Sequence, residues 1–184
     1  MRSLIVCPFS ACRAMHRLPI CLAIFCAACG VAPQPDSIRT VAAFEVPLPG
    51  ATDKADFIRL LRVVAKTHGY HVDTASPAEL RQMSAVSPIT LSAAVWRGND
   101  EEVLASAMDF QDHIGRIWLT FDKGQNPQRS RELRNDLMPQ VQRRWPTTAS
   151  LPIMPSGAIP LTDDLVRTPT GYDVKPTARS KYQR

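Results

Sequence analysis

The sequence predicts an α+β domain with one mostly antiparallel sheet and two long helices packed on one face of that sheet. Apolar residues recur at helical spacing in two long segments, 52–69 and 126–145. In five shorter segments apolar and polar residues alternate, and three of these follow one another with short polar turns between them. This succession is typical of antiparallel strands joined by hairpins.

The first strand and the first long helix are predicted between residues 41 and 69. The strand covers residues 41–48 and ends at Pro49-Gly50, with its apolar face formed by Phe44, Val46 and Leu48. Thr52 is the expected cap of the helix. The apolar stripe of this helix consists of Phe57, Leu60, Leu61, Val64 and Ala65. Gly69 provides the left-handed conformation that ends many helices.

A short helix and a meander are predicted next. Residues 70–74 form a brief strand. Ser76-Pro77-Ala78-Glu79 is a capping box, which opens a helix that runs to about Ser84. The three alternating segments of the meander are 89–97, 102–110 and 114–121.

The last long helix and the C-terminal residues complete the prediction. Asn126-Pro127 opens the helix, and Pro139 is expected to kink it. The apolar residues of this helix are Leu133, Leu137, Val141 and Trp145. The prolines of residues 151–161 exclude a central strand but allow an edge strand or a segment lying across the sheet. Residues 162–184 are polar, and we expect a disordered tail there.

The net charge excludes one class of partner. The whole chain has a formal charge of +5, but three of its basic residues, Arg2, Arg13 and Arg17, precede Cys29. From Cys29 onward 19 basic residues face 17 acidic ones, which gives +2. Such a balance, without aromatic residues interleaved among the basic ones, does not indicate nucleic-acid binding.

All five cysteines, at positions 7, 12, 21, 26 and 29, fall within the first 29 residues. The folded domain therefore contains no disulfide, no thiolate metal site and no cysteine nucleophile. A zinc cluster in the N-terminal stretch is disfavoured because its spacings lack a second CxxC pair and its other residues are membrane-like. We expect no metal and no other cofactor.

The N-terminal residues have the pattern of a secretion signal. From Met15, a positive segment precedes eleven mostly apolar residues, 18–28, with small residues at the end. Eleven helical residues span about half of a membrane's hydrocarbon core, so a permanent transmembrane helix is the weaker interpretation. Because residues 1–14 form a second, mildly apolar stretch, we favour Met15 as the true start.

Four residues at the end of this signal, Cys26-Ala27-Ala28-Cys29, resemble the lipobox of bacterial lipoproteins. Ala27, Ala28 and Cys29 fit that motif, and Cys26 stands where leucine is usual. The resemblance implies cleavage before Cys29, which would carry a diacylglycerol thioether and an acyl chain such as palmitate on its amine. Two or three chains are enough for stable anchoring. Gly30, in the place of the aspartate that retains lipoproteins at the inner membrane, implies the outer membrane, with the protein facing the periplasm.

The chain is thus divided into four parts. Residues 1–28 form the signal peptide, residues 29–40 the lipidated cysteine with a proline-containing tether, residues 41–161 the α+β domain, and residues 162–184 the polar tail. The order of elements in the domain is loosely similar to ferredoxin-like sandwiches. A resemblance of fold alone carries no function.

No catalytic residue is predicted. His68 and His71 lie at a helix end and on a strand, so their rings need not converge. Ser156-Gly157 lacks the Gly-x-Ser-x-Gly elbow of a serine nucleophile. The adjacent side chains of Asp163 and Asp164 diverge if the segment is extended. These patterns favour a protein without enzymatic activity.

The alternation of the meander predicts a candidate binding face. If Val95 and Leu119 point into the core, then Trp96, Arg116 and Trp118 point to the other side of the sheet. Tryptophan and arginine are enriched at binding hot spots. The alternative is that residues 151–161 fold back over the two tryptophans and bury them.

These observations leave three functional hypotheses. The first is a non-catalytic, lipid-anchored protein that binds a protein partner in the periplasm, for example an immunity or inhibitor lipoprotein. The second is an accessory subunit of an envelope assembly or transporter. The third is a hydrolase whose residues converge only in three dimensions.

Overall fold

The computed structural model describes residues 36–84, 89–97, 102–109 and 116–182. Every described residue belongs to one compact unit. The signal peptide, the lipobox and Cys29 lie outside the described residues.

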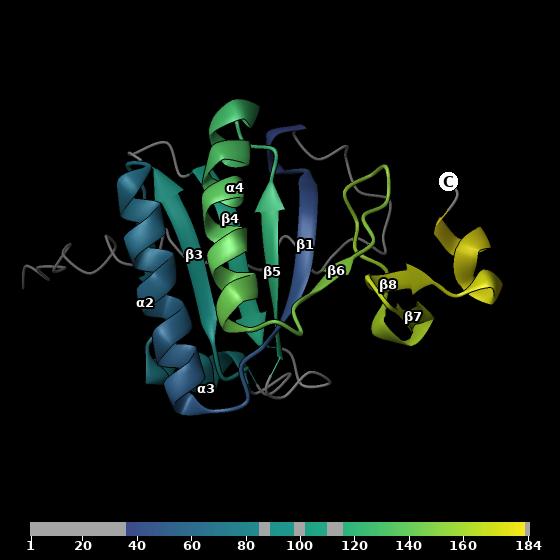
Figure 1. Cartoon of the computed structure of the whole chain (residues 1–184), viewed down its shortest axis with the longest axis horizontal. Helices are drawn as coiled ribbons and strands as arrows, with labels where there is room; N and C mark the ends of the chain where they lie inside the picture. Colours follow the sequence, from purple (N-terminus) through teal and green to yellow (C-terminus); the bar gives the residue numbers. More distant parts are fainter. Residues whose placement is uncertain (1–35, 85–88, 98–101, 110–115, 183–184) are drawn as a thin grey trace, which may run out of the picture. The chain divides into compact units, whose positions relative to one another are not determined.

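The described part is an α+β domain with one mixed eight-stranded sheet, whose strand order is β2-β3-β4-β5-β1-β6-β8-β7 (Figure 1). The strands are β1 Thr40–Pro47, β2 His71–Thr74, β3 Ser92–Arg97, β4 Glu102–Asp109, β5 Arg116–Asp122, β6 Ala149–Leu151, β7 Leu165–Thr168 and β8 Gly171–Val174. β6 and β8 pair in parallel, and the other neighbours pair antiparallel. The predicted meander of β3, β4 and β5 is confirmed.

The helices are α2 Ala51–Thr67, α3 Pro77–Met83 and α4 Pro127–Arg144, with short 3-10 turns η2 Asp36–Ile38, η4 Thr162–Asp164 and η5 Pro176–Tyr182. α2 is capped by Gly50 and not, as predicted, by Thr52. The Asp53 carboxylate accepts the Gly50 N–H at 3.3 Å. The helix therefore begins at Ala51, earlier in the chain than a cap at Thr52 would allow. Gly69 has a φ of 75°, as its predicted role in ending the helix requires.

The predicted caps of the other two helices are confirmed. The Ser76 hydroxyl accepts the Glu79 N–H at 3.3 Å, and the Glu79 carboxylate accepts the Ser76 N–H at 2.7 Å. The Asn126 side chain accepts two backbone N–H groups of the first turn of α4. α4 continues through Pro139 as a single helix.

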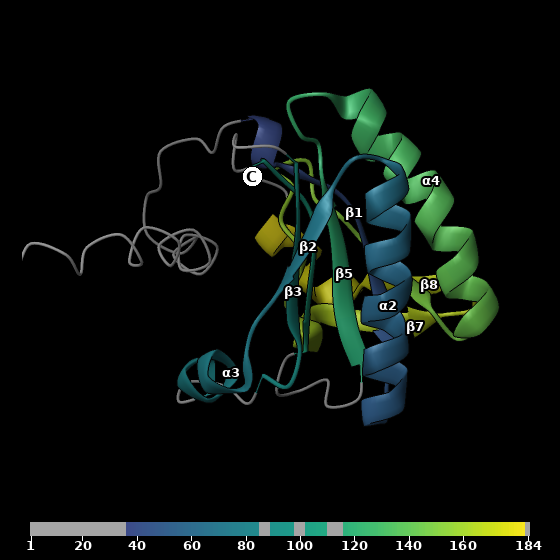
Figure 2. The same ribbon diagram turned by 90° about the vertical axis from the view of Figure 1, so that its left-hand side faces the viewer.

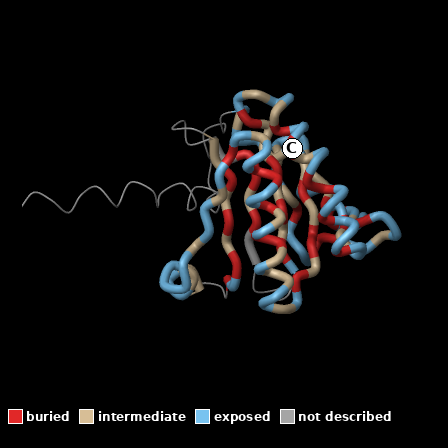
Figure 3. Tube along the Cα trace, turned by 60° about the vertical axis from the view of Figure 1, so that its left-hand side comes forward, coloured by how far each residue is buried: buried red, intermediate tan, exposed pale blue. Residues whose placement is uncertain are grey.

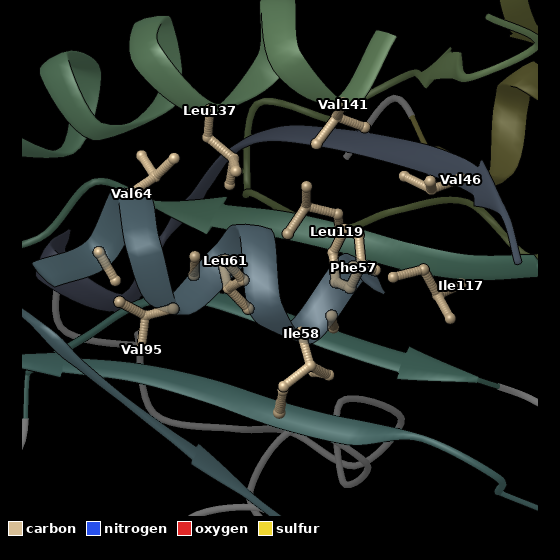
Figure 4. Close-up of a cluster of buried hydrophobic side chains, with 14 of the residues drawn as sticks. Val46, Phe57, Ile58, Leu61, Val64, Val95, Ile117, Leu119, Leu137 and Val141 are labelled. Atoms are coloured by element: carbon tan, nitrogen blue, oxygen red, sulfur yellow. The ribbon is translucent and has the colours of Figure 1, made fainter. Parts of the chain in front are cut away.

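One large apolar cluster, which we call the first cluster, contains side chains from α2, α4 and the central strands (Figure 4). Residues that alternate along the strands supply one side of it: Val46, Val95, Ala105, Ala107, Ile117, Leu119 and Phe121. Phe57, Leu61, Leu137 and Val141 of the two long helices are almost fully buried in it. Figure 3 shows this alternation as buried residues that recur along the strands. The predicted helical stripes and strand faces are therefore confirmed.

The other side of the sheet is called the opposite face. By alternation it carries Ala43, Glu45, Ser92, Ala94, Trp96, Ser106, Arg116, Trp118 and Thr120. Over β1 and β5 this face bears a smaller second cluster, made of the buried Ala43, Leu151 and Leu165 with partly buried neighbours. The opposite face thus includes both polar and apolar regions.

The structure corrects the expectation of a disordered tail, because residues 162–182 contain η4, β7, β8 and η5. The strands are only four residues long, and their two-residue loop lacks the Asn-Gly type of signal by which hairpins are recognised. β8 docks beside β6 at Gly171, where a Cβ atom would lie 2.5 Å from the Ser150 carbonyl oxygen. Polar side chains that suggest disorder in the sequence are instead hydrogen-bonded within the fold.

Candidate functional site

The three residues of the predicted binding face lie on the opposite face, but the structure does not bring all three together. Arg116 and Trp118 are two residues apart on β5. The register of β3, β4 and β5 places Trp118 level with Ser92, four residues along β3 from Trp96. Four residues along and two strands across separate the tryptophan Cα atoms by about 17 Å.

The two tryptophans also have different surroundings. Trp118 is half-buried and packs against the second cluster, as do Ile153 and Ile159 of the proline-rich segment. Trp118 and this segment therefore share a cluster, and the folding back of residues 151–161 over both tryptophans stays a prediction. Trp96 is half-buried but belongs to neither cluster of the described residues. The indole nitrogens of both rings are buried, so the two differ in the cluster they join.

Beside Trp118 lies a group of polar side chains that we call the Glu45 cluster: Glu45, Arg116, Arg167 and Tyr172. Glu45 is 4% exposed, although it is charged and lies on a central strand. Its Oε1 accepts the Tyr172 hydroxyl at 2.7 Å and Arg116 Nη1 at 2.8 Å. Arg167 Nη1 is 3.7 Å from the same oxygen. The buried carboxylate is therefore satisfied by hydrogen bonds and by two cations.

Three strand pairings position this cluster. On β1, Glu45 is opposite Trp118 of β5 and opposite Ala149 of β6. Arg167 and Tyr172 are paired across the β7–β8 hairpin, and the Arg167 guanidinium lies 4.9 Å from the centre of the Tyr172 ring. The β7–β8 hairpin therefore places the Arg167 guanidinium and the Tyr172 hydroxyl side by side at the Glu45 carboxylate.

The arrangement suits recognition better than proton transfer. Arg116 and Arg167 have side chains 52% and 48% exposed, so both guanidinium groups reach solvent while one side of each is held by Glu45. One carboxylate and two guanidinium groups leave a local charge of +1. A preorganised arginine retains donors that fit a carboxylate or phosphate of a partner.

A second buried carboxylate, Asp164, holds the end of the described chain. Its Oδ2 accepts the Tyr182 hydroxyl at 2.6 Å, and its Oδ1 accepts Lys181 Nζ at 2.9 Å. The Tyr182 oxygen in turn accepts the Leu161 N–H at 3.0 Å. The hydrogen bond from Tyr182, followed by that from Lys181, lowers the pKa of Asp164. Asp164 is therefore a structural anion.

The pKa of Asp122, at the end of β5, is raised, whereas that of Asp164 is lowered. Burial raises the pKa of Asp122 to about 6, and the hydrogen bond from the Thr40 hydroxyl, 3.0 Å away, offsets only part of that rise. Its carboxyl group is thus partly protonated near pH 6.

The remaining candidates stay apart. His68 Nε2 lies 2.9 Å from Asp136 Oδ2 and links α2 to α4, whereas His71 is exposed on β2. The Ser156 hydroxyl accepts the Ala158 N–H in a turn. Within residues 36–182, wherever the structure describes them, no group of three histidines, cysteines or acidic residues could hold a metal. None of the helices in these same segments is both long and apolar enough to cross a membrane.

Comparison of the chain with protein-family models, with curated proteins and with solved structures finds no match. The function is therefore inferred from the sequence and from the geometry of the site.

Sequence reasoning found Arg116 and Trp118 but missed Glu45, Arg167 and Tyr172. The last two lie in the segment that was expected to be disordered. One signal for Glu45 was available. Glu45 is a charged residue in the middle of a central strand, and such a residue needs a polar partner on the same face of the sheet.

Proposed function

We propose that this protein is a lipid-anchored, periplasm-facing protein without catalytic activity, which binds a protein partner through the Glu45 cluster and the adjoining Trp118. An immunity or inhibitor lipoprotein is the specific form of this proposal. Anchoring through Cys29 at the outer membrane is part of it, and its support is the lipobox-like sequence Cys26-Ala27-Ala28-Cys29.

The observation that carries the proposal is the pair of half-exposed arginines on one buried carboxylate. Holding a guanidinium in place before binding reduces the entropy lost when a partner docks. Arginine and tyrosine side chains beside a tryptophan have the composition of binding hot spots. We infer that an acidic group on the partner is placed between Arg116 and Arg167.

A finer description of the fold is part of the same proposal. We infer that α2 and α4 both lie on the side of the first cluster, in a loosely ferredoxin-like layering, so that the opposite face is the functional one. The contribution of both helices to a single cluster supports this arrangement.

The anchor is tested with the full chain expressed in a Gram-negative host. We expect Cys29→Ala to abolish labelling with a palmitate analogue and to leave the precursor unprocessed. Labelling that persists, or that moves to Cys26, would contradict the assignment of Cys29.

The binding surface is tested by a photo-crosslinking amino acid at position 167, with position 179 as the matched control. Arg179 is likewise an exposed arginine of the C-terminal region, paired with Asp173 and apart from the cluster. We expect one discrete adduct from position 167 and none from position 179. The adduct's identity separates a delivered toxin from a subunit of an envelope assembly.

With the partner in hand, we expect Arg116→Ala to weaken binding by about thirtyfold, which corresponds to about 2 kcal/mol. Arg179→Ala is the control and should leave affinity unchanged. Equal affinities for both variants would remove the Glu45 cluster from the interface.

A further inference from the structure

A second surface, apart from the Glu45 cluster, is lined by residues of α2 and of the edge strand β2, whose ribbons are labelled in Figure 2. We call it the α2–β2 groove. It is an open depression of about 520 Å³, lined by Lys54, Ala55, Ile58, Arg59, Arg62, Val63, Thr74 and Leu91. β2 is the terminal strand of the described sheet, so the groove borders a sheet edge.

The lining of the groove combines positive charge with apolar surface. Its charged side chains are all cationic: Lys54, Arg59 and Arg62. Arg59 pairs with Asp56 at 2.7 Å, and Arg62 donates to the Thr74 hydroxyl at 3.1 Å. Val63 is 58% exposed, so it adds accessible apolar surface to the groove.

The edge of β2 adds backbone hydrogen-bonding groups to this surface. Ala75 N–H donates to the Ser92 carbonyl at 3.0 Å, so Ala75 belongs to a hydrogen-bonded pair with β3. Such pairs alternate in an antiparallel ladder, so the N–H and C=O groups of Val72 and Thr74 point away from β3. These are also the two residues whose side chains lie on the groove side, since Val72 packs on the first cluster and Thr74 lines the groove.

We infer that the α2–β2 groove binds an extended, acidic segment of a partner protein, which adds to the sheet as a strand beside β2. The outward backbone groups of Val72 and Thr74 would pair with the main chain of the added strand. Every second side chain of that strand would enter the groove, where the cations favour aspartate or glutamate and the apolar lining favours aliphatic residues. This goes beyond the proposed function, because it uses a different surface from the Glu45 cluster.

The open strand edge is what selects an extended segment over an anionic lipid surface. A lipid headgroup could use the three cations but has no use for a row of backbone donors and acceptors at strand spacing. Outward main-chain groups beside a groove suit strand addition.

The experiment uses a random dodecapeptide library selected on the full chain. We expect the selected peptides to carry acidic residues at alternate positions. Binding should fall at least tenfold with Arg62→Glu, which reverses charge in the groove, and with Thr74→Pro, which removes one outward N–H at an edge position that tolerates proline.

A matched control makes the result specific. Lys66→Glu makes the same charge change on an exposed residue of α2 outside the groove, and it should bind the peptides within about twofold of the wild type. Because Thr74→Pro can also disturb folding, amide hydrogen exchange of the wild type gives a second readout. Peptide should slow exchange at Val72 and Thr74.

Three outcomes would overturn the inference. They are selected peptides without alternating acidic residues, equal weakening by Arg62→Glu and Lys66→Glu, and unchanged exchange at Val72 and Thr74 when peptide is bound. In a parallel arm, vesicles with 30% phosphatidylglycerol are added. Binding to them that depends on Arg62 but not on the Thr74 N–H, without peptide binding, would replace the peptide with a lipid surface.

Discussion

The region around the first cluster and the C-terminal region from β6 to η5 are stabilised in different ways. The region around the first cluster contains a continuous set of apolar side chains from the two long helices and the central strands. The C-terminal region contributes Leu151 and Leu165 to the second cluster, which also contains Ala43 of β1, and its hairpin is joined to β1 through the buried Glu45. Figure 1 shows the small hairpin of β7 and β8 at one edge of the sheet, the other edge being β2.

The same device appears twice in the C-terminal region. Glu45 accepts a hydroxyl from Tyr172 at 2.7 Å, and Asp164 accepts one from Tyr182 at 2.6 Å. In each case a basic side chain lies on the same carboxylate. Where a segment is too small to bury much apolar surface, hydrogen-bonded ion pairs can fix its position. This region should therefore respond to side-chain polarity and, through Asp164, to pH, while the first cluster responds to lost volume.

The largest effect is expected from truncation in the first cluster. Phe57 is fully buried and lies edge-on to Trp145, with ring centres 5.8 Å apart. Phe57→Ala should lower the free energy of unfolding by about 3 to 5 kcal/mol, because it leaves a cavity. Val63→Ala, on the exposed side of the same helix, should change it by less than about 0.5 kcal/mol. Denaturant unfolding of both variants measures the contrast, and equal losses would contradict it.

The contributions of Asp122 and Asp164 to the free energy of unfolding should depend on pH in opposite directions. The folded-state pKa of Asp122, about 6, lies above its unfolded value, so its contribution to stability is greatest at low pH and falls as the pH rises toward 6. Asp122→Asn keeps the Thr40 hydrogen bond and should gain stability over the wild type between pH 4 and 7.5, by at most about 3 kcal/mol.

The lowered pKa of Asp164 gives the reverse sign. Its contribution is present above the ordinary aspartate pKa and is lost as the pH falls through its lower folded-state value. Urea unfolding of wild type, Asp122→Asn and Asp164→Asn at a series of pH values separates the two groups. A difference between wild type and Asp122→Asn that stays constant with pH would show that Asp122 is not buried as described.

The two tryptophans test how far the C-terminal segment covers the opposite face. Trp118→Ala should cost about 2 kcal/mol, below the range for a fully buried ring, because Trp118 is half-buried against the second cluster. Trp96→Ala should cost less, about 1 kcal/mol, because Trp96 is in neither cluster of the described residues. Thermal melts give the order, and a larger loss for Trp96→Ala would show that Trp96 is the better covered of the two rings.

The smallest effect is expected from a single hydroxyl in the Glu45 cluster. Tyr172→Phe removes one hydrogen bond to Glu45 and should cost about 1 kcal/mol. The loss should appear as faster amide exchange in β7 and β8, with little change in β3 to β5. Uniform acceleration across the sheet would mean that the C-terminal region and the first cluster unfold as one unit.

Most elements of the region around the first cluster could be predicted from the sequence because each is determined by residues close together in the chain. The stripe of α2, the capping box at Ser76 and the Asn126 cap all act within a few residues of the chain. The strand faces followed from alternation, which is a property of the extended backbone. The one misplaced cap, Thr52, was decided by a neighbouring carboxylate that competes for the same end of the helix.

Local patterns in the chain were enough to predict the α+β class, the meander, and the side of the sheet on which Trp96, Arg116 and Trp118 lie, and they supplied the lipobox-like N-terminus as a hypothesis. The folded domain was needed to show that Trp118 packs against the second cluster, that Trp96 lies far from it, and that Glu45 meets Arg167 and Tyr172. More than 100 positions along the chain separate Glu45 from these two partners. No local pattern encodes such a contact, because the carboxylate is satisfied only when a distant hairpin docks on the sheet.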